Sequence, residues 1–490
     1  MGFLKQVRPW HLGLLFVHMW IYCATHRPAA TDEVSVMVVM YAVLSAALVA
    51  VFCAVRAAVR RGMPLAQVPS HKLALGLDVA AACALAVAGG LLAAPAVLSP
   101  LGSVVVASVL GGLGVAWAYM RWGQFYAQLD IHYAAPLVFL TMAVGSVGKT
   151  LVDFLPAAPA AAVLTAIPFL LFACLRRSLA TVPPAAEPIC YYNARTVGSL
   201  WRLAAGIAVY SLTVGVIQSV FLEAMPSPYH TSVLVHHGSE ILLALAMLLW
   251  VTVARRGLDF SRTWRLILIL MATALIFEPY FDPAFLSYLL SLVRTAQTFL
   301  IVFLFLALAD VARHSQYHPM VVFSLGWVAY SLPFAVGKGA GDELAALGSG
   351  ASLVMAAIVW VLVVVTLFVL DEASLGNRLV FTELNDGGDD DTPAKRMGAM
   401  QRALNEQDDA NRLQADVLSL RCSALAESYG LTPREREILE LLARGRSKTH
   451  IAEAFLISEN TVRGHVKHIY AKLDVHGKQE LVDKLESVEV

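Results

Sequence analysis

Long apolar stretches separated by shorter polar segments make up most of the chain. About twelve of them are long enough, or nearly so, to cross a membrane as helices of roughly 20 residues. They begin near Trp10, Val34, Lys72, Leu101, Ile131, Ala160, Trp201, Thr231, Trp264, Tyr288, Met320 and Ser352. The first stretch has no convincing signal-peptide cleavage site and is followed by the others, so we interpret it as a span. The pattern predicts a polytopic bundle of transmembrane helices over residues 1–371.

The pattern changes after the last apolar stretch. Residues 372–428 begin with an acidic, Gly-containing run that is typical of a flexible linker, and they continue with a helix-like stretch of intermittent apolar positions. Gln407 and Asn411 interrupt the heptad pattern of this stretch, so a long coiled coil is not supported. Two roles remain open for it: a short helix that docks on the domain that follows, or one that pairs weakly with its copy in a second chain.

Residues 429–490 have the spacing of four short helices. Three of these helices begin at residues that can cap them, namely Thr432, which forms a capping box with Glu435, then Ser447 and Ser458. The third helix has an apolar stripe that faces a core, made by Val462, Val466, Ile469 and Leu473. The opposite face therefore carries Asn460, Arg463, Gly464 and Lys467. Two helices joined by a short turn, the second with basic side chains, form the helix-turn-helix that places a recognition helix in the major groove of DNA.

This run of residues closely resembles the LuxR-type (FixJ-like) DNA-binding domain. The resemblance covers Leu431 to about Leu485 and rests on the runs LTPRE, IAE, ISENTVRGHV and IYAKLDV. It implies a four-helix module whose third helix reads bases and whose fourth helix joins two copies as a homodimer on double-stranded DNA. The DNA contacts that it implies are Lys448, Thr449, Ser458, Asn460, Thr461, Arg463, Gly464 and Lys467.

The resemblance also assigns roles within this set. The base-reading positions are Arg463, Gly464 and Lys467, and the phosphate positions are Thr461 and Lys448. The chain departs from the family at His450, where Glu is usual, and at Gly464, where a side chain is usual. Glycine costs roughly 1 kcal/mol of helix propensity relative to Ala, and it leaves fewer groups to read the DNA sequence. The alternative interpretation of Arg463 and Lys467 is a solvated helix face, and a further alternative is that these helices bind a protein.

Composition agrees with a membrane protein. The chain is 58% hydrophobic and 15% charged, with a mean hydropathy of +0.67, which is too apolar for a soluble protein. The fold class that we expect is therefore all-α, a helical membrane bundle followed by the four-helix domain. The cysteines are scattered without metal-ligand spacing, at Cys23, Cys53, Cys83, Cys174, Cys190 and Cys422. We expect buried thiols and assign neither a disulfide nor a metal site.

The basic residues of the loops predict the orientation of the bundle. If the N-terminus is cytoplasmic, the outer side receives only Arg27, Lys149 and Lys338. The inner side then receives Lys5, Arg8, Arg56, Arg60, Arg61, Lys72, Arg121, Arg176, Arg177, Arg195, Arg202, Arg255, Arg256, Arg262, Arg265 and Arg313. This distribution follows the positive-inside rule. An even number of spans also places the C-terminal domain in the cytoplasm, where the DNA is.

An internal repeat agrees with this count of spans. The longest inner loop, residues 176–200, divides the spans six and six, and the run Arg60-Arg61-Gly62 after the second span has a counterpart in Arg255-Arg256-Gly257 after the eighth. Parallel halves of six spans are the organisation of the major facilitator fold, which the membrane part resembles in span number and loop lengths.

Ionisable and amide groups within the spans indicate where a ligand could bind, because such groups usually face a cavity or a partner. The predicted ligand pocket consists of His236, His237, Glu240, Arg294 and Gln297. In it, Arg294 or His236 would meet an anionic or polar group of an unknown small molecule, with Glu240 balancing the charge. The alternative for each residue is an internal ion pair or a residue of an interfacial loop. Further candidates near span ends or interiors are His18, Asp78, Lys149, Asp153, Gln218 and Glu278.

No catalytic constellation or cofactor motif is present in the sequence, so we expect no enzyme activity and no cofactor. The first hypothesis is a one-component transcription regulator in the cytoplasmic membrane of a bacterium, with both termini in the cytoplasm, that senses a small molecule or the state of the membrane. The second is a transporter of the major facilitator kind with a regulatory DNA-binding domain. Net transport of a solute would distinguish the two.

Overall fold

The structure is a computed structural model that describes residues 6–25, 35–61, 69–94, 97–183, 200–222, 229–253, 283–346, 418–455 and 457–487, with isolated positions between these ranges. The chain divides into two compact units, Met1–Arg396 and Met397–Val490. Both units are helical, and the described residues contain no β-strand beyond one isolated bridge between Tyr192 and Ser315. The expected all-α fold class is therefore confirmed.

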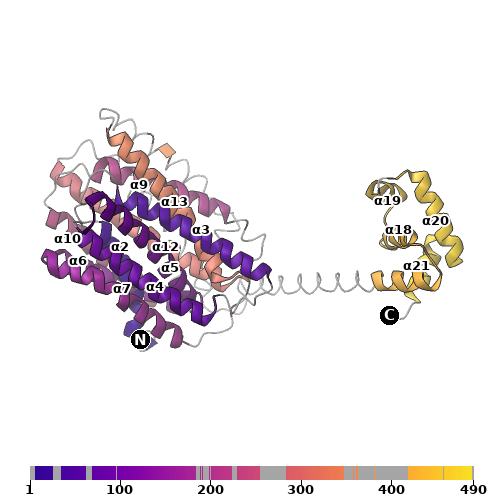
Figure 1. Cartoon of the computed structure of the whole chain (residues 1–490), viewed down its shortest axis with the longest axis horizontal. Helices are drawn as coiled ribbons and strands as arrows, with labels where there is room; N and C mark the ends of the chain where they lie inside the picture. Colours follow the sequence, from indigo (N-terminus) through magenta and orange to yellow (C-terminus); the bar gives the residue numbers. More distant parts are fainter. Residues whose placement is uncertain are drawn as a thin grey trace. The chain divides into compact units, whose positions relative to one another are not determined.

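The first unit is a bundle of long helices (Figure 1). A 3-10 helix, Pro9–Leu14, leads into α2 (Leu15–Thr25), and the bundle continues with α3 (Val36–Arg60), α4 (His71–Ala93), α5 (Pro100–Tyr126), α6 (Ile131–Asp153), α7 (Ala157–Ala180), α9 (Trp201–Ile217), a π-helical turn (Gln218–Leu222), α10 (Tyr229–Thr252), α12 (Pro283–Arg313) and α13 (Pro319–Ala346). Among the described residues, nine helices are long and apolar enough to cross a membrane.

These nine helices coincide with nine of the predicted spans, those from Val34 to Trp201 and those near Thr231, Tyr288 and Met320. The first predicted span consists of six residues of 3-10 helix and eleven of α-helix. Because the 3-10 helix rises about 2 Å per residue and the α-helix about 1.5 Å, this segment is roughly 28 Å long, close to the hydrocarbon thickness of a bilayer. The predicted spans near Trp264 and Ser352 lie outside the described residues.

The surface of the bundle is apolar. Large hydrophobic side chains such as Leu151, Leu242 and Leu249 are exposed on α6 and α10. The expectation that the thiols are buried is correct for Cys23 and Cys422, whereas Cys174 is half-buried. It is wrong for Cys53, Cys83 and Cys190, which are exposed. A soluble monomer rarely exposes large contiguous apolar patches, whereas a helix surface in contact with lipid consists of such side chains.

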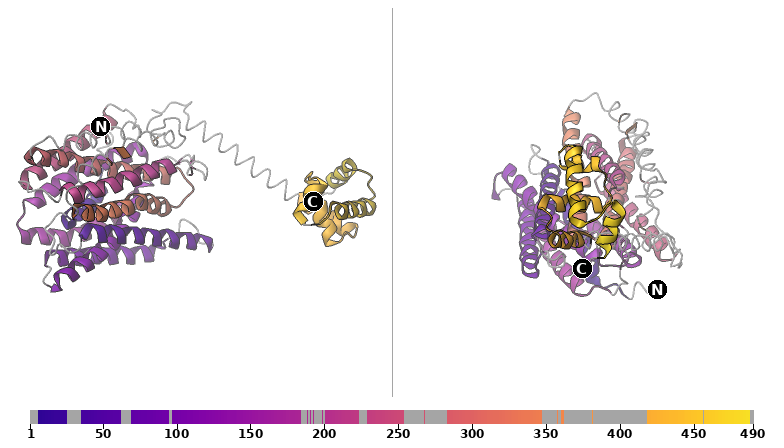
Figure 2. Two further views of the ribbon diagram at one scale, coloured as in Figure 1. Left: turned by 90° about the horizontal axis from the view of Figure 1, so that it is seen from above. Right: turned by 90° about the vertical axis from the view of Figure 1, so that its right-hand side faces the viewer.

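The two halves of the bundle pack on each other reciprocally. Helix α3, the second span of the first half, packs on α13, which is the fifth predicted span of the second half. Helix α6, the fifth span of the first half, packs in turn on α10, the second span of the second half. Figure 1 labels both pairs of helices, and Figure 2 shows the long helices of the bundle from two further directions. The second span of each half thus packs on the fifth span of the other half. Such a reciprocal contact indicates a two-fold relation between the halves. This packing agrees with the repeat inferred from the loops.

Two glycines allow the tightest helix contact in the bundle, between α9 and α13. A Cβ atom on Gly337 would collide with the backbone carbonyl of Leu212, and a Cβ atom on Gly215 would collide with the backbone of Phe334 and Lys338. Small residues at such positions let helix backbones approach closely, and the resulting van der Waals packing is one source of helix association inside a bilayer.

The second unit is a small helical domain with its own core. It contains α18 (Pro433–Ala443), α19 (Lys448–Phe455), α20 (Glu459–Leu473) and α21 (Lys478–Glu486), in the order and at the spacing that the sequence predicts. A further helix covers residues 418–428, and its Cys422 and Leu425 are buried in the core of this domain. Of the two roles left open for the helix-like stretch, docking on the following domain is therefore the one observed for these residues. The acidic run and residues 394–417 lie outside the described residues.

Candidate DNA-binding surface and buried polar cluster

The helix-turn-helix is built from α19 and α20. The Ser447 hydroxyl accepts a hydrogen bond from the His450 amide at 3.2 Å, and the Ser458 hydroxyl accepts one from the Thr461 amide at 3.1 Å. At the turn, the Ile457 amide donates to the Ala452 carbonyl. These local bonds satisfy backbone groups at the helix ends and fix the point at which each helix begins.

The outward face of α20 carries the predicted base-reading positions. The residues exposed on it are Asn460, Thr461, Arg463, Gly464 and Lys467. The opposite face holds Val462, Val466, Ile469 and Leu473, all buried. The guanidinium of Arg463 lies 2.8 Å from Glu459, one turn earlier on the exposed surface. Exposed pairs of this kind contribute little to stability, so the Arg463 side chain can leave Glu459 for another acceptor at small cost.

The remaining predicted DNA contacts differ in their surroundings. Lys448 and Thr449 are exposed at the start of α19. The hydroxyls of Ser458 and Thr461 lie 2.8 Å apart, so both take part in the cap of α20. No atom of the protein lies within 4 Å of the position that a Cβ atom on Gly464 would occupy. A side chain would therefore fit there, and its absence leaves an open surface on α20.

A buried carboxylate joins α18 to α20. Glu435 accepts hydrogen bonds from the backbone amide of Thr432 at 2.8 Å and from the ammonium of Lys472 at 2.7 Å, and this completes the predicted capping box. Burial by itself would raise the pKa of Glu435, but the hydrogen bonds from Lys472 and Thr432 outweigh it and lower the pKa to about 2. The carboxylate is therefore charged throughout the physiological range.

Replacing Glu435 by Gln should lower the free energy of unfolding of the C-terminal unit by about 1 to 2 kcal/mol at neutral pH, because the charge-assisted bond to Lys472 is lost, whereas the Gln amide oxygen can still accept from the Thr432 amide. The folded-state pKa lies below the ordinary value of 4.5. The stabilisation by the carboxylate is thus present above the unfolded pKa and is lost as the pH falls towards the folded pKa. Urea unfolding of Met397–Val490 at several pH values should show the two proteins converging between about pH 4.5 and pH 2. Glu437→Gln, at an exposed position, is the control, and a difference independent of pH would contradict this account.

Helix α21 contributes to the core of its own domain. Leu481 and Leu485 are buried, and Val482 is half-buried. The ammonium of Lys484 donates to the carbonyl of Leu473 at the end of α20 and lies 4.4 Å from the centre of the Tyr429 ring. The side chains of α21 that remain exposed, such as Gln479 and Asp483, are polar.

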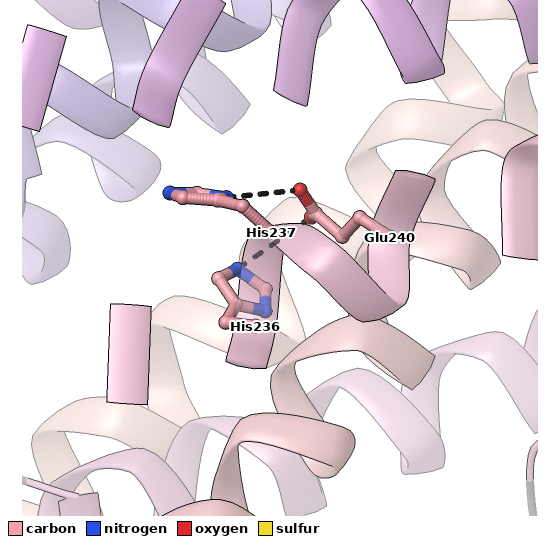
Figure 3. Close-up of side chains that lie close together, drawn as sticks. All are labelled: His236, His237 and Glu240. Atoms are coloured by element: carbon pink, nitrogen blue, oxygen red, sulfur yellow. Dashed lines mark hydrogen bonds and ion pairs between the residues drawn. The ribbon is translucent and has the colours of Figure 1, made fainter. Parts of the chain in front are cut away.

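In the membrane unit, a cluster of charged side chains surrounds Glu240 on α10. The Glu240 side chain is fully buried, and its Oε2 accepts hydrogen bonds from Lys149 at 2.6 Å and from Ser146 at 2.7 Å, both on α6. His236 Nε2 lies 3.5 Å from Oε1, and His237 Nδ1 lies 3.2 Å from Oε2. Figure 3 shows both imidazoles next to the Glu240 carboxylate, each joined to it by a dashed line.

The cluster extends to α2 and α12. His237 Nε2 lies 3.3 Å from Asp153, and Asp153 accepts a hydrogen bond from the Tyr22 hydroxyl at 2.8 Å. His236 Nδ1 lies 3.2 Å from the hydroxyl of Thr295. Four helices from both halves of the bundle thus meet at one network, and each buried charge has an opposite charge or a polar neighbour, as burial in a bilayer requires.

A cavity of about 90 Å³ lies next to this network, between the two halves. The predicted pocket residues His236, Arg294 and Gln297 line it, whereas His237 and Glu240 do not. Gln218 also lines it and donates to the Gln297 side chain at 2.6 Å, and Gln297 donates to the hydroxyl of Tyr330. The structure therefore brings the five predicted pocket residues into one region, with the internal ion pairs and the cavity side by side.

Two basic residues that the loop charges assign to the outer side, Lys149 and Lys338, lie inside the bundle. Lys149 is buried against Glu240, and Lys338 is buried and donates to the Ser219 hydroxyl at 3.1 Å. That assignment was wrong, because both residues lie within helices near their ends and turn into the bundle rather than into solvent. Asp78, a further candidate, pairs with Arg121 at 3.0 Å and accepts a hydrogen bond from Trp117.

Lys149 and Asp153 were further candidates from the sequence, but Ser146 and the stripe that the three residues form on α6 were not predicted. Ser146, Lys149 and Asp153 recur at helical spacing in an otherwise apolar helix and all face α10. This spacing was visible in the sequence and would have predicted a polar contact along one face of α6. Its partner on α10 could not be deduced in the same way.

The ligand atoms of His236, His237 and Glu240 lie within 4.8 Å of one another, which is a spacing that a metal ion can use. However, the ammonium of Lys149 already contacts Glu240 at 2.6 Å. A divalent cation at this place would have to displace Lys149 or accept a second positive charge close by, so the arrangement fits an ion-pair network better than a metal centre.

The compact domain with an exposed basic second helix defines a DNA-binding helix-turn-helix protein. Residues 429–485 match the family described as bacterial regulatory proteins, luxR family. The spore germination protein GerE of Bacillus subtilis is 44% identical over 55 residues, which are 11% of this chain and 74% of GerE. The chain belongs to this family.

Other relatives share only part of their length with this chain. The nitrate/nitrite response regulator NarL of Escherichia coli is 29% identical over 136 residues, which are 24% of this chain and 63% of NarL. An HTH-type transcriptional regulator of Mycobacterium tuberculosis, Rv0890c, is 41% identical over 60 residues, which are 12% of this chain and 7% of that protein. The chain thus spans less than two thirds of these two relatives.

Proposed function

We propose that this protein is a one-component transcription regulator embedded in the cytoplasmic membrane of a bacterium, which binds double-stranded DNA through α20 and senses a small molecule through the cavity of the bundle. One observation carries the proposal. A single chain holds both a luxR-family domain with an exposed basic recognition helix and an apolar bundle whose two halves meet at a cavity with polar walls.

Such a regulator needs its DNA-binding domain and its gene in the same compartment. The loop charges favour an orientation with both termini in the cytoplasm. In this orientation the C-terminal end of α2 and the π-helical turn after α9 point to the outer side, and His18, Tyr22 and Gln218 of these segments line the cavity. The small molecule therefore reaches the protein from outside the cytoplasm.

We further propose that two copies bind a two-fold DNA site and that α21 pairs them. The exposed polar face of α21 and the half-buried Val482 are available for this contact. A ligand can shift the bundle between two states only if it binds one of them more tightly. The segment between the bundle and α18 would then pass this shift to the pairing of the DNA-binding domains.

The test is genome-wide crosslinking and sequencing of DNA bound to the full-length protein, compared with an Arg463→Ala, Lys467→Ala double variant. A few sharp sites that disappear in the double variant are expected. If the wild-type protein is expressed in the membrane and gives no sites with or without candidate ligands, the proposed function is wrong.

A transporter with a regulatory DNA-binding domain is the second candidate. The observation that favours it is the reciprocal packing of α3 on α13 and of α6 on α10 around a central cavity, since transporters with parallel repeats move their halves around such a site. Uptake of labelled solute into vesicles that contain the protein separates the two candidates, because a pure sensor binds its ligand without net transport.

A further inference from the structure

One residue of the segment that joins the spans to the C-terminal helices is buried in the bundle. Phe381 lies beyond the last predicted span, within the first compact unit, and its relative exposure is 0%. The centre of its ring lies 5.1 Å from that of Phe303 on α12, in an edge-to-face arrangement. Burial of an aromatic ring is among the largest apolar contributions that a single side chain can make. The bundle therefore holds this point of the segment.

The backbone of Phe381 is held as well. Its amide donates a hydrogen bond of 3.1 Å to Oδ2 of Asp310, whose side chain is fully buried. The Tyr192 hydroxyl donates to the same oxygen at 3.4 Å, and His314 Nδ1 lies 3.3 Å from Oδ1. A buried carboxylate needs donors around it, because burial without them is costly. The Phe381 amide thus supplies one of the polar contacts that allow Asp310 to lie inside the protein.

The conformation of Phe381 is strained. Its φ is 62°, in the left-handed region that bulky side chains rarely adopt. The other described non-glycine residue with a positive φ is Asp474 at the end of α20, where a short polar side chain tolerates this conformation. Strain of this kind persists only where the surrounding contacts outweigh it, and it is common in switch regions. The ring contact and the hydrogen bond therefore hold Phe381 against a backbone that relaxes on release.

Helix α12 carries both the contacts of Phe381 and part of the cavity wall. Its residues that line the cavity are Arg294, Gln297, Thr298 and Ile301. Phe303 and Asp310, which hold Phe381, follow on the same helix. At 1.5 Å per residue, Ile301 and Asp310 lie about 14 Å apart along the helix axis. Because a helix is a rigid element, a shift of α12 at the cavity also moves the groups that hold Phe381.

We propose that the end of α12 is a docking site for the segment that joins the spans to the C-terminal helices, with Phe381 as its anchor, and that a shift of α12 releases Phe381. Release frees the segment from the bundle, and this passes the state of the bundle towards the DNA-binding helices. The role in signalling rests on the proposed function, while the docking itself can be measured without DNA.

The docking is tested by limited digestion of the full-length protein in lipid nanodiscs with chymotrypsin, which cuts after accessible aromatic residues. Mass spectrometry follows the cut of the peptide bond after Phe381. We expect this cut to be slow in the wild-type protein. Phe303→Ala should accelerate it by about tenfold or more, because cleavage follows the population of the released form. Phe305→Ala is the matched control, since Phe305 is also a buried phenylalanine of α12 but packs on Tyr126 and Phe323.

The wild-type protein offers a second measurement, which stays decisive if Phe303→Ala fails to fold. Hydrogen exchange of the Phe381 amide should be slowed by about tenfold or more relative to an unprotected amide, because this amide is bonded to a buried carboxylate. Rapid exchange of this amide, fast cleavage in the wild-type protein, or equal acceleration by Phe303→Ala and Phe305→Ala would each overturn the docking.

The signalling role is tested with Phe381→Ala in the full-length protein, which removes the ring that anchors the segment. Occupancy of the DNA sites recovered by crosslinking should change by about fivefold or more, the usual size of coupling between two sites. Phe154→Ala is the control, since Phe154 is an exposed phenylalanine at the end of α6 and its loss should leave the occupancy unchanged.

The outcomes separate the docking from the proposed function. An occupancy that Phe381→Ala leaves at the wild-type level would overturn the signalling role of the anchor. Absence of DNA sites for every protein, together with slow cleavage after Phe381, would contradict the proposed function and leave the docking intact. Recovered DNA sites together with fast cleavage after Phe381 in the wild-type protein would do the opposite.

Discussion

Replacing Lys149 by Met is expected to destabilise the membrane bundle by about 3 to 5 kcal/mol, because the substitution leaves the Glu240 carboxylate buried without its positive partner. Glu240 is fully buried, and the distance from its Oε2 to Lys149 Nζ is 2.6 Å. The loss should appear as a marked fall in the thermal unfolding temperature of the full-length protein in detergent, followed by tryptophan fluorescence.

A second substitution tests the cause of that loss. In the Lys149→Met, Glu240→Gln double variant no unpaired charge remains, so most of the stability should return. Lys72→Met is the matched control, since Lys72 is an exposed cation at the start of α4 and its removal should change the unfolding temperature little. If the single and double variants are equally unstable, packing of the Lys149 chain rather than its charge holds α6 and α10 together.

The C-terminal domain could be predicted from sequence almost residue by residue. Its helix starts depend on contacts within three or four residues, such as the Ser458 cap on the Thr461 amide and the capping box of Thr432 and Glu435. Local contacts of this kind are visible in a single sequence. The ion pair of Glu435 with Lys472, 37 residues away, was not visible, because it depends on how α18 and α20 pack.

The membrane unit shows the same division between local and distant contacts. Hydrophobic length alone predicted the nine helices, since a bilayer requires about 20 apolar residues per span. The approach of His236 to Glu240 one turn later also followed from helical spacing. The partner that dominates Glu240 is Lys149, which lies 91 residues away on α6. Its side chain was assigned to an outer loop because sequence position near a helix end does not show whether a side chain turns into the bundle.

The sequence repeat and the observed helix packing both indicate two related halves of the bundle. The sequence repeat divides the spans six and six, and the observed contacts exchange the second and fifth spans of the halves. The residues that line the cavity come from both halves, including His18 and Lys149 from the first and His236 and Arg294 from the second. A ligand held there contacts both halves at once and is therefore well placed to change how they pack.

Replacing Arg463 and Lys467 together by Ala is expected to weaken specific DNA binding by about 2 to 6 kcal/mol, if each side chain reads a base and their effects add. Both residues are exposed on α20, next to Gly464, which offers no side chain of its own. If α20 reads bases as proposed, these two basic side chains would carry most of the sequence reading available to this face. Their exposure also means that the fold should be nearly unchanged, within about 0.5 kcal/mol of unfolding free energy.

The measurement is a gel-shift titration of Met397–Val490 on the sites recovered by crosslinking, at several salt concentrations. Arg436→Ala is the matched control, since Arg436 is an exposed cation on α18 outside the helix-turn-helix. Loss of a base contact weakens binding to the recovered site more than to unrelated DNA, whereas loss of a phosphate contact weakens both equally and reduces the salt dependence. Glu459→Gln should act in the opposite direction and strengthen binding, because Glu459 holds Arg463 at 2.8 Å in the free domain and competes with DNA for it. If the double variant binds like the wild type, α20 presents only a solvated face, and the contacts to DNA or to a protein partner must be sought on another surface of the domain.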